Sequence, residues 1–221
     1  MGGDHHHPHT DHGEHDHHDH PGLEDDIQLG KRARRVLAME ELLVEKEVIR
    51  RDDVPRLLDF MAAMSPVDGA RVVARAWTDP AFKAQLLDDP RVALAELGYP
   101  LVSGAKLAVV ENTEKVHHLV VCTLCSCYPR SLLGPPPDWY KSFAYRSRAV
   151  VDPRGVMKEF GLQVGEEVEV RVVDSAADLR YMVLPLRPGG TDGLNEEELA
   201  ALVTRDSLVG VGVAQSPAVG G

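Results

Sequence analysis

Hydrophobic residues recur every three or four positions between residues 24 and 49, and Glu and Arg fill most of the positions between them. This spacing places the apolar side chains on one side of an α-helix and the charges on the other. We therefore expect one long amphipathic helix here, with an apolar side that needs a cover. Its apolar stripe comprises Ile27, Ala33, Val36, Leu37, Met39, Leu42, Leu43 and Val48.

Four further helix starts share one signal, a short polar residue placed directly before a proline. The side chain of such a residue can accept hydrogen bonds from the first free amides of a helix, and proline suits the first helical position. Helices are therefore expected to begin at the pairs Ser65-Pro66, Asp79-Pro80, Asp89-Pro90 and Asp152-Pro153. Gly98-Tyr99-Pro100 should end the first group.

After Gly104 the pattern changes to short runs rich in β-branched residues, which is typical of strands. We expect two strand pairs, each formed by neighbours in the sequence and joined by a polar turn. The first pair is 107–111 and 116–121 around the turn 112–115, and the second is 168–173 and 181–186 around the turn 174–178. Asn195 with Glu198 predicts a capped helix through Thr204.

These elements indicate an α+β fold, with a helical N-terminal arm followed by a layered α-β-β-α metal-binding core. The expected divisions are a disordered head (1–22), the arm (23–103), the core (104–210) and a flexible tail (211–221). The head contains nine of the eleven histidines, mixed with Asp, Gly and Pro, and has almost nothing apolar to bury. It could bind divalent metal loosely, or it is a solvated tail or a cloning tag.

The composition excludes several classes of partner. A formal net charge of −11 opposes binding to a nucleic-acid backbone or to an anionic membrane surface. No apolar run approaches the roughly 20 residues of a membrane span, and the N-terminus lacks the apolar stretch of a secretory signal. We expect a cytoplasmic protein.

The three cysteines, Cys122, Cys125 and Cys127, all lie within six residues. An odd number of thiols this close together does not suit a disulfide framework and indicates a metal or redox site. A structural zinc site or a [4Fe–4S] cluster needs a fourth ligand, which the loop lacks. A copper(I) site, a two-cysteine redox pair with a spare, and an open reactive metal site remain as alternatives.

The spacing Cys125-Ser126-Cys127 adds a further expectation. Sulfurs from residues i and i+2 of a tight loop bring the intervening backbone nitrogens close to the same ion. By general coordination chemistry, a strongly Lewis-acidic ion could take these nitrogens as ligands and keep one position open for a reaction.

The segment Cys122-Thr123-Leu124-Cys125-Ser126-Cys127 resembles the metal-binding signature of nitrile hydratase α subunits, and Thr123 resembles their cobalt-type form. The resemblance covers roughly residues 30–210. It also rests on an ordered series of shorter blocks, at 76–80, 111–113, 116–118, 145–148, 183–185, 187–188, 190–193 and 202–207.

The resemblance implies roles for these residues. Cys122, Cys125 and Cys127 would give sulfur ligands to a low-spin Co(III), with iron as a less favoured metal. Ser126 and Cys127 would give backbone nitrogens, and Cys125 and Cys127 would be oxidised to sulfinate and sulfenate. Cys125, Ser126 and Cys127 are the catalytic candidates for hydrating a small nitrile. The nucleophile would be the sulfenate oxygen of Cys127 or, alternatively, a metal-bound hydroxide.

The partners implied by the family are a β subunit of one or two chains, in an αβ hetero-oligomer that the N-terminal arm would embrace, and an activator protein that inserts cobalt. Arg130 departs from the family pattern, which commonly has Trp there, and resembles the γ subunit of thiocyanate hydrolase. A positive side chain there could attract an anion such as thiocyanate, although pairing with a partner carboxylate is the preferred interpretation. A cobalt-binding or metallochaperone protein is a further alternative.

Several other residues carry weaker expectations. Alternation along a strand should point one of His117 and His118 inward and the other outward, each in a structural role. Trp139 and Tyr140 are expected to pack at a subunit interface. Salt bridges in an interface or the core are predicted for Arg146, Arg148 and Arg187.

Overall fold

The computed structural model describes residues 30–99 and 104–217, so the predicted head and the first residues of the predicted long helix lie outside it. The chain divides into two units, Met1–Val54 and Pro55–Gly221, which are considered separately. In the described part of the chain, no helix combines the length and the apolar character needed to cross a bilayer.

The described part of the first unit is dominated by helix α1 (Lys31–Glu45), which confirms a helix at the apolar stripe. None of its residues is buried within the chain. Val36 and Met39 expose 62% and 63% of their surface, so the apolar side predicted from the sequence is open. The chain leaves the helix through Glu47, which has a positive φ of 57°.

The second unit begins with most of α2 (Asp53–Ala63), followed by α3 (Pro66–Thr78), α4 (Pro80–Asp88) and α5 (Pro90–Glu96). The proline-based starts are confirmed. The Asp79 carboxylate accepts hydrogen bonds from the amides of Ala81 and Phe82 at 2.9 and 3.0 Å, and Ser65 accepts one from Val67 at 3.3 Å. Asp152 does the same for α9 (Pro153–Glu159).

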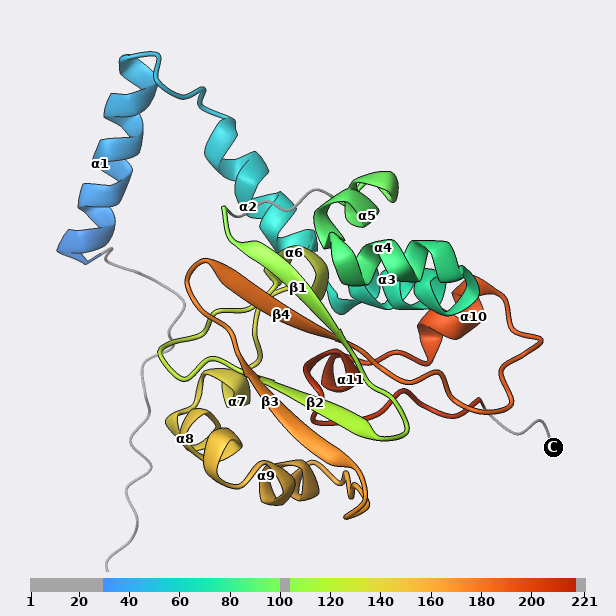
Figure 1. The fold of residues 1–221 in the computed structure, drawn as a ribbon. Coiled ribbons are helices and arrows are strands. Elements are labelled where there is room, and N and C mark those ends of the chain that lie inside the picture. The colour runs from blue at the N-terminus through green and yellow to red at the C-terminus, as the bar shows by residue number, and fades with distance from the viewer. Residues whose placement is uncertain (1–29, 100–103, 218–221) are drawn as a thin grey trace, which may run out of the picture. The chain divides into compact units, whose positions relative to one another are not determined.

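All four strands form within two residues of their predicted bounds, as β1 (Lys106–Glu111), β2 (Val116–Val121), β3 (Glu169–Asp174) and β4 (Leu179–Leu184). Their predicted pairing is wrong. β1 pairs with β4 and β2 with β3, both in parallel, so neighbours in sequence do not form hairpins (Figure 1). The physical reason is burial on both faces: five of the six residues of β2 are buried, a pattern typical of covered parallel strands.

Helices cover these strands and complete the unit (Figure 1). α4 and α5 contact β1, while α8 (Phe143–Val151) and α9 contact β2 and β3 respectively. α11 (Arg205–Val209) contacts β2 and β4. The predicted cap at Asn195 is confirmed by a capping box that begins α10 (Glu196–Ala201), although this helix ends before Thr204. The result is a mixed helix and strand fold with two small parallel sheets.

Candidate metal centre

The cysteine loop follows directly from β2, which delivers a fully buried Cys122. Pro129 ends the loop and precedes the short helix α6 (Arg130–Leu133). A rigid strand and a proline therefore fix the two ends of a loop of few residues. The chain between them must turn back on itself.

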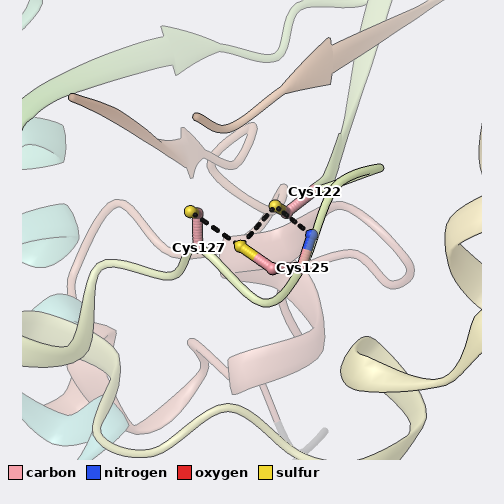
Figure 2. A group of neighbouring side chains, drawn as sticks. All are labelled: Cys122, Cys125 and Cys127. Atoms are coloured by element: carbon pink, nitrogen blue, oxygen red, sulfur yellow. Dashed lines mark hydrogen bonds between the residues drawn. The ribbon is translucent and has the colours of Figure 1, made fainter. Parts of the chain in front are cut away.

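This turn brings the three sulfurs together, and Figure 2 shows them pointing toward one another. The Sγ atom of Cys125 lies 3.7 Å from that of Cys122 and 3.3 Å from that of Cys127, and all three lie within 4.8 Å of one another. Cys122 and Cys127 are buried, whereas Cys125 is exposed. The cluster therefore fits a thiophilic ion that two buried sulfurs bind on the protein side and that solvent reaches past Cys125.

The surroundings of the thiols favour unequal protonation. Hydrogen bonding to Cys127 and to the backbone of Ser126 lowers the pKa of Cys125. Burial, together with the neighbouring thiols, raises the pKa of Cys127 to about 12. The amide of Cys125 also donates a hydrogen bond to the sulfur of Cys122 at 3.3 Å, as expected around a thiolate.

Thr123 is held by two residues outside the loop. Asp174, the last residue of β3, accepts hydrogen bonds from the Thr123 amide at 2.9 Å and from its hydroxyl at 2.5 Å. The guanidinium of Arg146 donates to the Thr123 carbonyl at 3.3 Å. The loop is thus anchored at its second residue through every polar group of that residue. Within the described residues Arg146 binds this carbonyl and no carboxylate, so a salt bridge to a partner subunit stays a prediction.

A cluster of aromatic rings supports the loop from the interior. The hydroxyl of Tyr140 donates to the carbonyl of Cys127 at 2.9 Å, and that of Tyr145 donates to the carbonyl of Val120 at 2.6 Å. Burial raises the pKa of both phenols, so they stay protonated donors. The predicted interface role is wrong for Tyr140, which is fully buried; the half-buried Trp139 packs edge-on against it.

His117 and His118 are both buried, which corrects the expected division into one inward and one outward residue. Helices cover both faces of β2, so neither side chain reaches water. His117 contacts the Gly210 carbonyl at 2.8 Å through Nε2 and the Asn112 side chain at 3.2 Å through Nδ1. The Asn112 carbonyl oxygen accepts from the amide of His118 at 2.7 Å. Their predicted structural role agrees with this network.

The remaining arginines differ from one another. Arg148 forms the predicted salt bridge, with Glu159 at 2.7 Å. Among the described residues Arg187 pairs with no carboxylate; it donates to the carbonyl of Trp77 at 3.1 Å and to Thr191 at 2.8 Å. It therefore ties α3 to the segment after β4.

A cavity of about 430 Å³ opens beside the cysteines. Residues around α2 supply apolar lining, the cysteine loop supplies one wall, and two arginines complete it. The lining residues are Leu57, Met61, Met64, Cys125, Ser126, Cys127, Tyr128, Arg130, Ser131 and Arg180. Cys122 lies outside this lining, so Cys125, Ser126 and Cys127 are the predicted site residues that face the cavity.

Sequence reasoning missed Asp174, Tyr145 and Arg180. Each lies on an element distant in sequence from the cysteines. The parallel pairing of β2 with β3 brings Asp174 to the loop, and Arg180 of β4 lines the cavity beside it. The sequence offers only a weak signal for two of them: Asp174 stands at the start of a predicted polar turn, and Tyr145 lies in one of the blocks that carry the family resemblance.

Comparison with known proteins agrees with this geometry. The family model described as "Nitrile hydratase, alpha chain" matches residues 30–212. The chain belongs to the nitrile hydratase alpha-chain family. Over 186 residues it is 53% identical to the low-molecular weight cobalt-containing nitrile hydratase subunit alpha of Rhodococcus rhodochrous, covering 84% of this chain and 90% of that relative.

Two further relatives extend the comparison. The thiocyanate hydrolase subunit gamma of Thiobacillus thioparus is 43% identical over 188 residues, which cover 80% of this chain and 77% of that protein. A solved double mutant of the Fe-type nitrile hydratase from Comamonas testosteroni Ni1 is 44% identical, with a TM-score of 0.74 and coverage of 83% and 90% of the two chains.

Proposed function

We propose that this chain is the metal-carrying α subunit of a cobalt nitrile hydratase, which converts a nitrile and water to an amide. The convergence of three sulfurs at the edge of a cavity carries the proposal. The cobalt-containing relative at 53% identity supports cobalt over iron. The Fe-type neighbour, at 44% identity, supports the same fold and site.

In this proposal, the sulfurs of Cys122, Cys125 and Cys127 and the backbone nitrogens of Ser126 and Cys127 hold Co(III). Thiolates suit a thiophilic ion, and the sulfurs are already gathered within 4.8 Å. When bound, the ion would supply Lewis acidity that polarises the nitrile. Buried Cys122 anchors the site, while Cys125 and Cys127 face the cavity where substrate enters.

The remaining chemistry falls to the loop itself. We propose that Cys125 carries a sulfinate and Cys127 a sulfenate, two steps of the ordinary oxidation ladder of cysteine. The sulfenate oxygen of Cys127 then bonds to the nitrile carbon. A water molecule gives its oxygen to the sulfur and its two protons to the nitrogen, and the original S–O bond breaks, which releases the amide and restores the sulfenate. Tyr140 holds the carbonyl of Cys127 and so keeps this residue oriented toward the cavity.

Intact-mass and metal analysis of the purified complex tests the proposal. We expect about one cobalt per chain and three added oxygen atoms on the cysteine peptide, two on Cys125 and one on Cys127. Cys127→Ala should abolish hydration of a neutral nitrile, whereas Ser147→Ala, on the exposed part of α8, should not. A tetrahedral zinc site with unoxidised thiols, or unchanged hydration by Cys127→Ala, would contradict the assignment.

The partner and the architecture belong to the same proposal. We propose that a β subunit, of one or two chains, covers the open apolar side of α1, and that an activator inserts the cobalt. The relatives are themselves subunits, a nitrile hydratase subunit alpha and a thiocyanate hydrolase subunit gamma. The helix contacts on the two strand pairs support an α-β-β-α layering. We also propose a cytoplasmic location, which the absence of a disulfide among the three cysteines supports.

Thiocyanate hydrolysis is the second candidate, favoured by one observation: Arg130 lines the cavity beside the cysteines. The similarity to a thiocyanate hydrolase structure, at a TM-score of 0.78, supports a shared fold. Turnover of thiocyanate and of a neutral nitrile by the same assembled complex separates the two activities. We expect the nitrile to be the substrate.

A further inference from the structure

The cavity beside the cysteines has two chemically different walls. Leu57 and Met61 of α2, with Met64 just beyond it, supply an apolar surface. Arg130 and Arg180 supply two guanidinium groups, and no Asp or Glu lines the cavity. This combination suits a ligand that has a short apolar body and a negatively charged end.

Neither arginine side chain has a polar partner within the described part of the chain. No carboxylate there forms an ion pair with Arg130 or Arg180, and their side chains make no hydrogen bond to its residues. The Nη1 atom of Arg180 is buried without any partner. An unpaired guanidinium donor in such a place is costly, and an anionic ligand would relieve that cost.

Arg180 is held in a fixed place by the fold. It belongs to β4, where its backbone pairs with Leu107 of β1. Its side chain and that of Cys127 line the same cavity. A carboxylate bound to Arg180 would therefore lie in the same cavity as Cys127, the proposed reacting residue. The whole chain carries a net charge of −11, so this positive cavity is a local departure from the prevailing sign.

We propose that the cavity selects nitriles that carry a carboxylate a few bonds from the cyano carbon. The carboxylate pairs with Arg180 and secondarily with Arg130, and the methylene chain packs against the apolar wall of Leu57, Met61 and Met64. This inference rests on the proposed nitrile hydration and adds a substrate class to it. Charge-assisted hydrogen bonds to a guanidinium are strong enough to set such a preference.

The test compares 4-cyanobutanoate with its neutral isostere 4-cyanobutanamide on the assembled, cobalt-loaded complex. Wild type should show a kcat/KM for the carboxylate about tenfold or more above that for the amide, as one charge-assisted hydrogen bond allows. Arg180→Gln should lower the ratio of kcat/KM for the carboxylate to kcat/KM for the amide to about one. Arg180→Lys should keep part of the preference, and Arg130→Gln should reduce it less. Arg91→Gln, on α5 and outside the cavity, is the matched control for losing one positive charge.

A binding measurement does not depend on turnover. Calorimetric titration of 4-cyanobutanoate into the Cys127→Ala complex should give a dissociation constant about tenfold below that of 4-cyanobutanamide, and Arg180→Gln should erase the difference. Equal affinity and equal kcat/KM for the two compounds in wild type would overturn the inference, as would a preference that survives Arg180→Gln. If wild type hydrates neither compound nor any other nitrile, the proposed function itself fails, whatever the titration shows.

Discussion

Thr123 shows how a single residue can hold a reactive loop in position. Its amide and hydroxyl both donate to the Asp174 carboxylate, and its carbonyl accepts from Arg146. None of these contacts involves a cysteine, yet together they fix the backbone directly after Cys122. Groups that orient metal ligands from outside commonly affect affinity or activity almost as much as some ligands do.

Asp174→Asn tests this anchor because the amide keeps the size of the side chain and loses its charge. We expect cobalt uptake at limiting metal, or the activity of the loaded complex, to fall about 10- to 100-fold. Metal analysis and nitrile turnover measure the two outcomes. Asp178→Asn, in the turn between β3 and β4, is the control and should behave as wild type. Full cobalt loading and full activity of Asp174→Asn would show that the anchor is dispensable.

His117 makes the stability of the fold depend on pH. Burial lowers the pKa of His117 and His118 below the ordinary value of 6.5. The unfolded chain therefore takes up protons first as the pH falls. The free energy of unfolding should be constant above about pH 6.5 and decrease below it, by up to roughly 1.4 kcal/mol per pH unit for each histidine, until the lowered native pKa is passed.

His117→Gln isolates one of these groups, since an amide can still donate to the Gly210 carbonyl and accept from Asn112 but cannot titrate. Urea unfolding at pH 7.5 and 5.5 should show a smaller loss of stability in the variant than in wild type. The residual loss belongs to His118. An unchanged pH dependence would mean that His117 does not contribute.

At the scale of elements, the sequence predicts the positions of helices and strands along the chain better than it predicts which strands pair. The Asp-Pro and Ser-Pro starts and all four strands were predicted from local signals, and the local spacing of the cysteines predicted their convergence. The hairpins were wrong because pairing depends on burial of both faces of β2, which no local pattern of turn residues reveals. Asp174 was missed for the same reason, because parallel pairing with β2 brings the end of β3 to the loop. Arg180 was missed because no local pattern places β4 beside the cysteines.

Gly210 ends α11 and lies against the backbone of β2, where a residue with a side chain would not fit. Its φ is +90°, and a Cβ atom there would collide with the backbone carbonyl of His118. Gly210→Ala should therefore lower the free energy of unfolding by about 2 kcal/mol or more, since backbone strain and the collision add. Gly193→Ala is the control, because its Cβ would meet nothing within 4 Å. Denaturant unfolding of both variants at pH 7.5 measures the difference, and equal midpoints would contradict it.

At the scale of the whole molecule, the first unit carries apolar surface that the described chain does not bury. No residue of α1 is buried, and Val36 and Met39 are each more than 60% exposed. A helix with one open apolar side gains most of its stability from packing against something else. In the proposed enzyme, that cover is the β subunit.

Replacing Val36 and Met39 with Lys should raise the dissociation constant of the α–β complex about tenfold or more, because two charges would enter an apolar contact. The double variant Glu41→Gln with Glu45→Gln changes the charge by the same amount on the same helix and should assemble normally. Analytical ultracentrifugation with the partner measures both. Equal assembly of the two variants would place the partner elsewhere on the chain.

The distance along the chain between Thr123 and Asp174 also constrains the order of events during synthesis. The two residues are 51 positions apart, yet the carboxylate is the group that fixes the cysteine loop. At about 5–20 residues per second, the thiols leave the ribosome roughly 3–10 s before Asp174 does. The cysteines of the nascent chain are therefore exposed before Asp174 can fix their loop. We expect ordered cobalt insertion only after the segment that contains Asp174 has been synthesised.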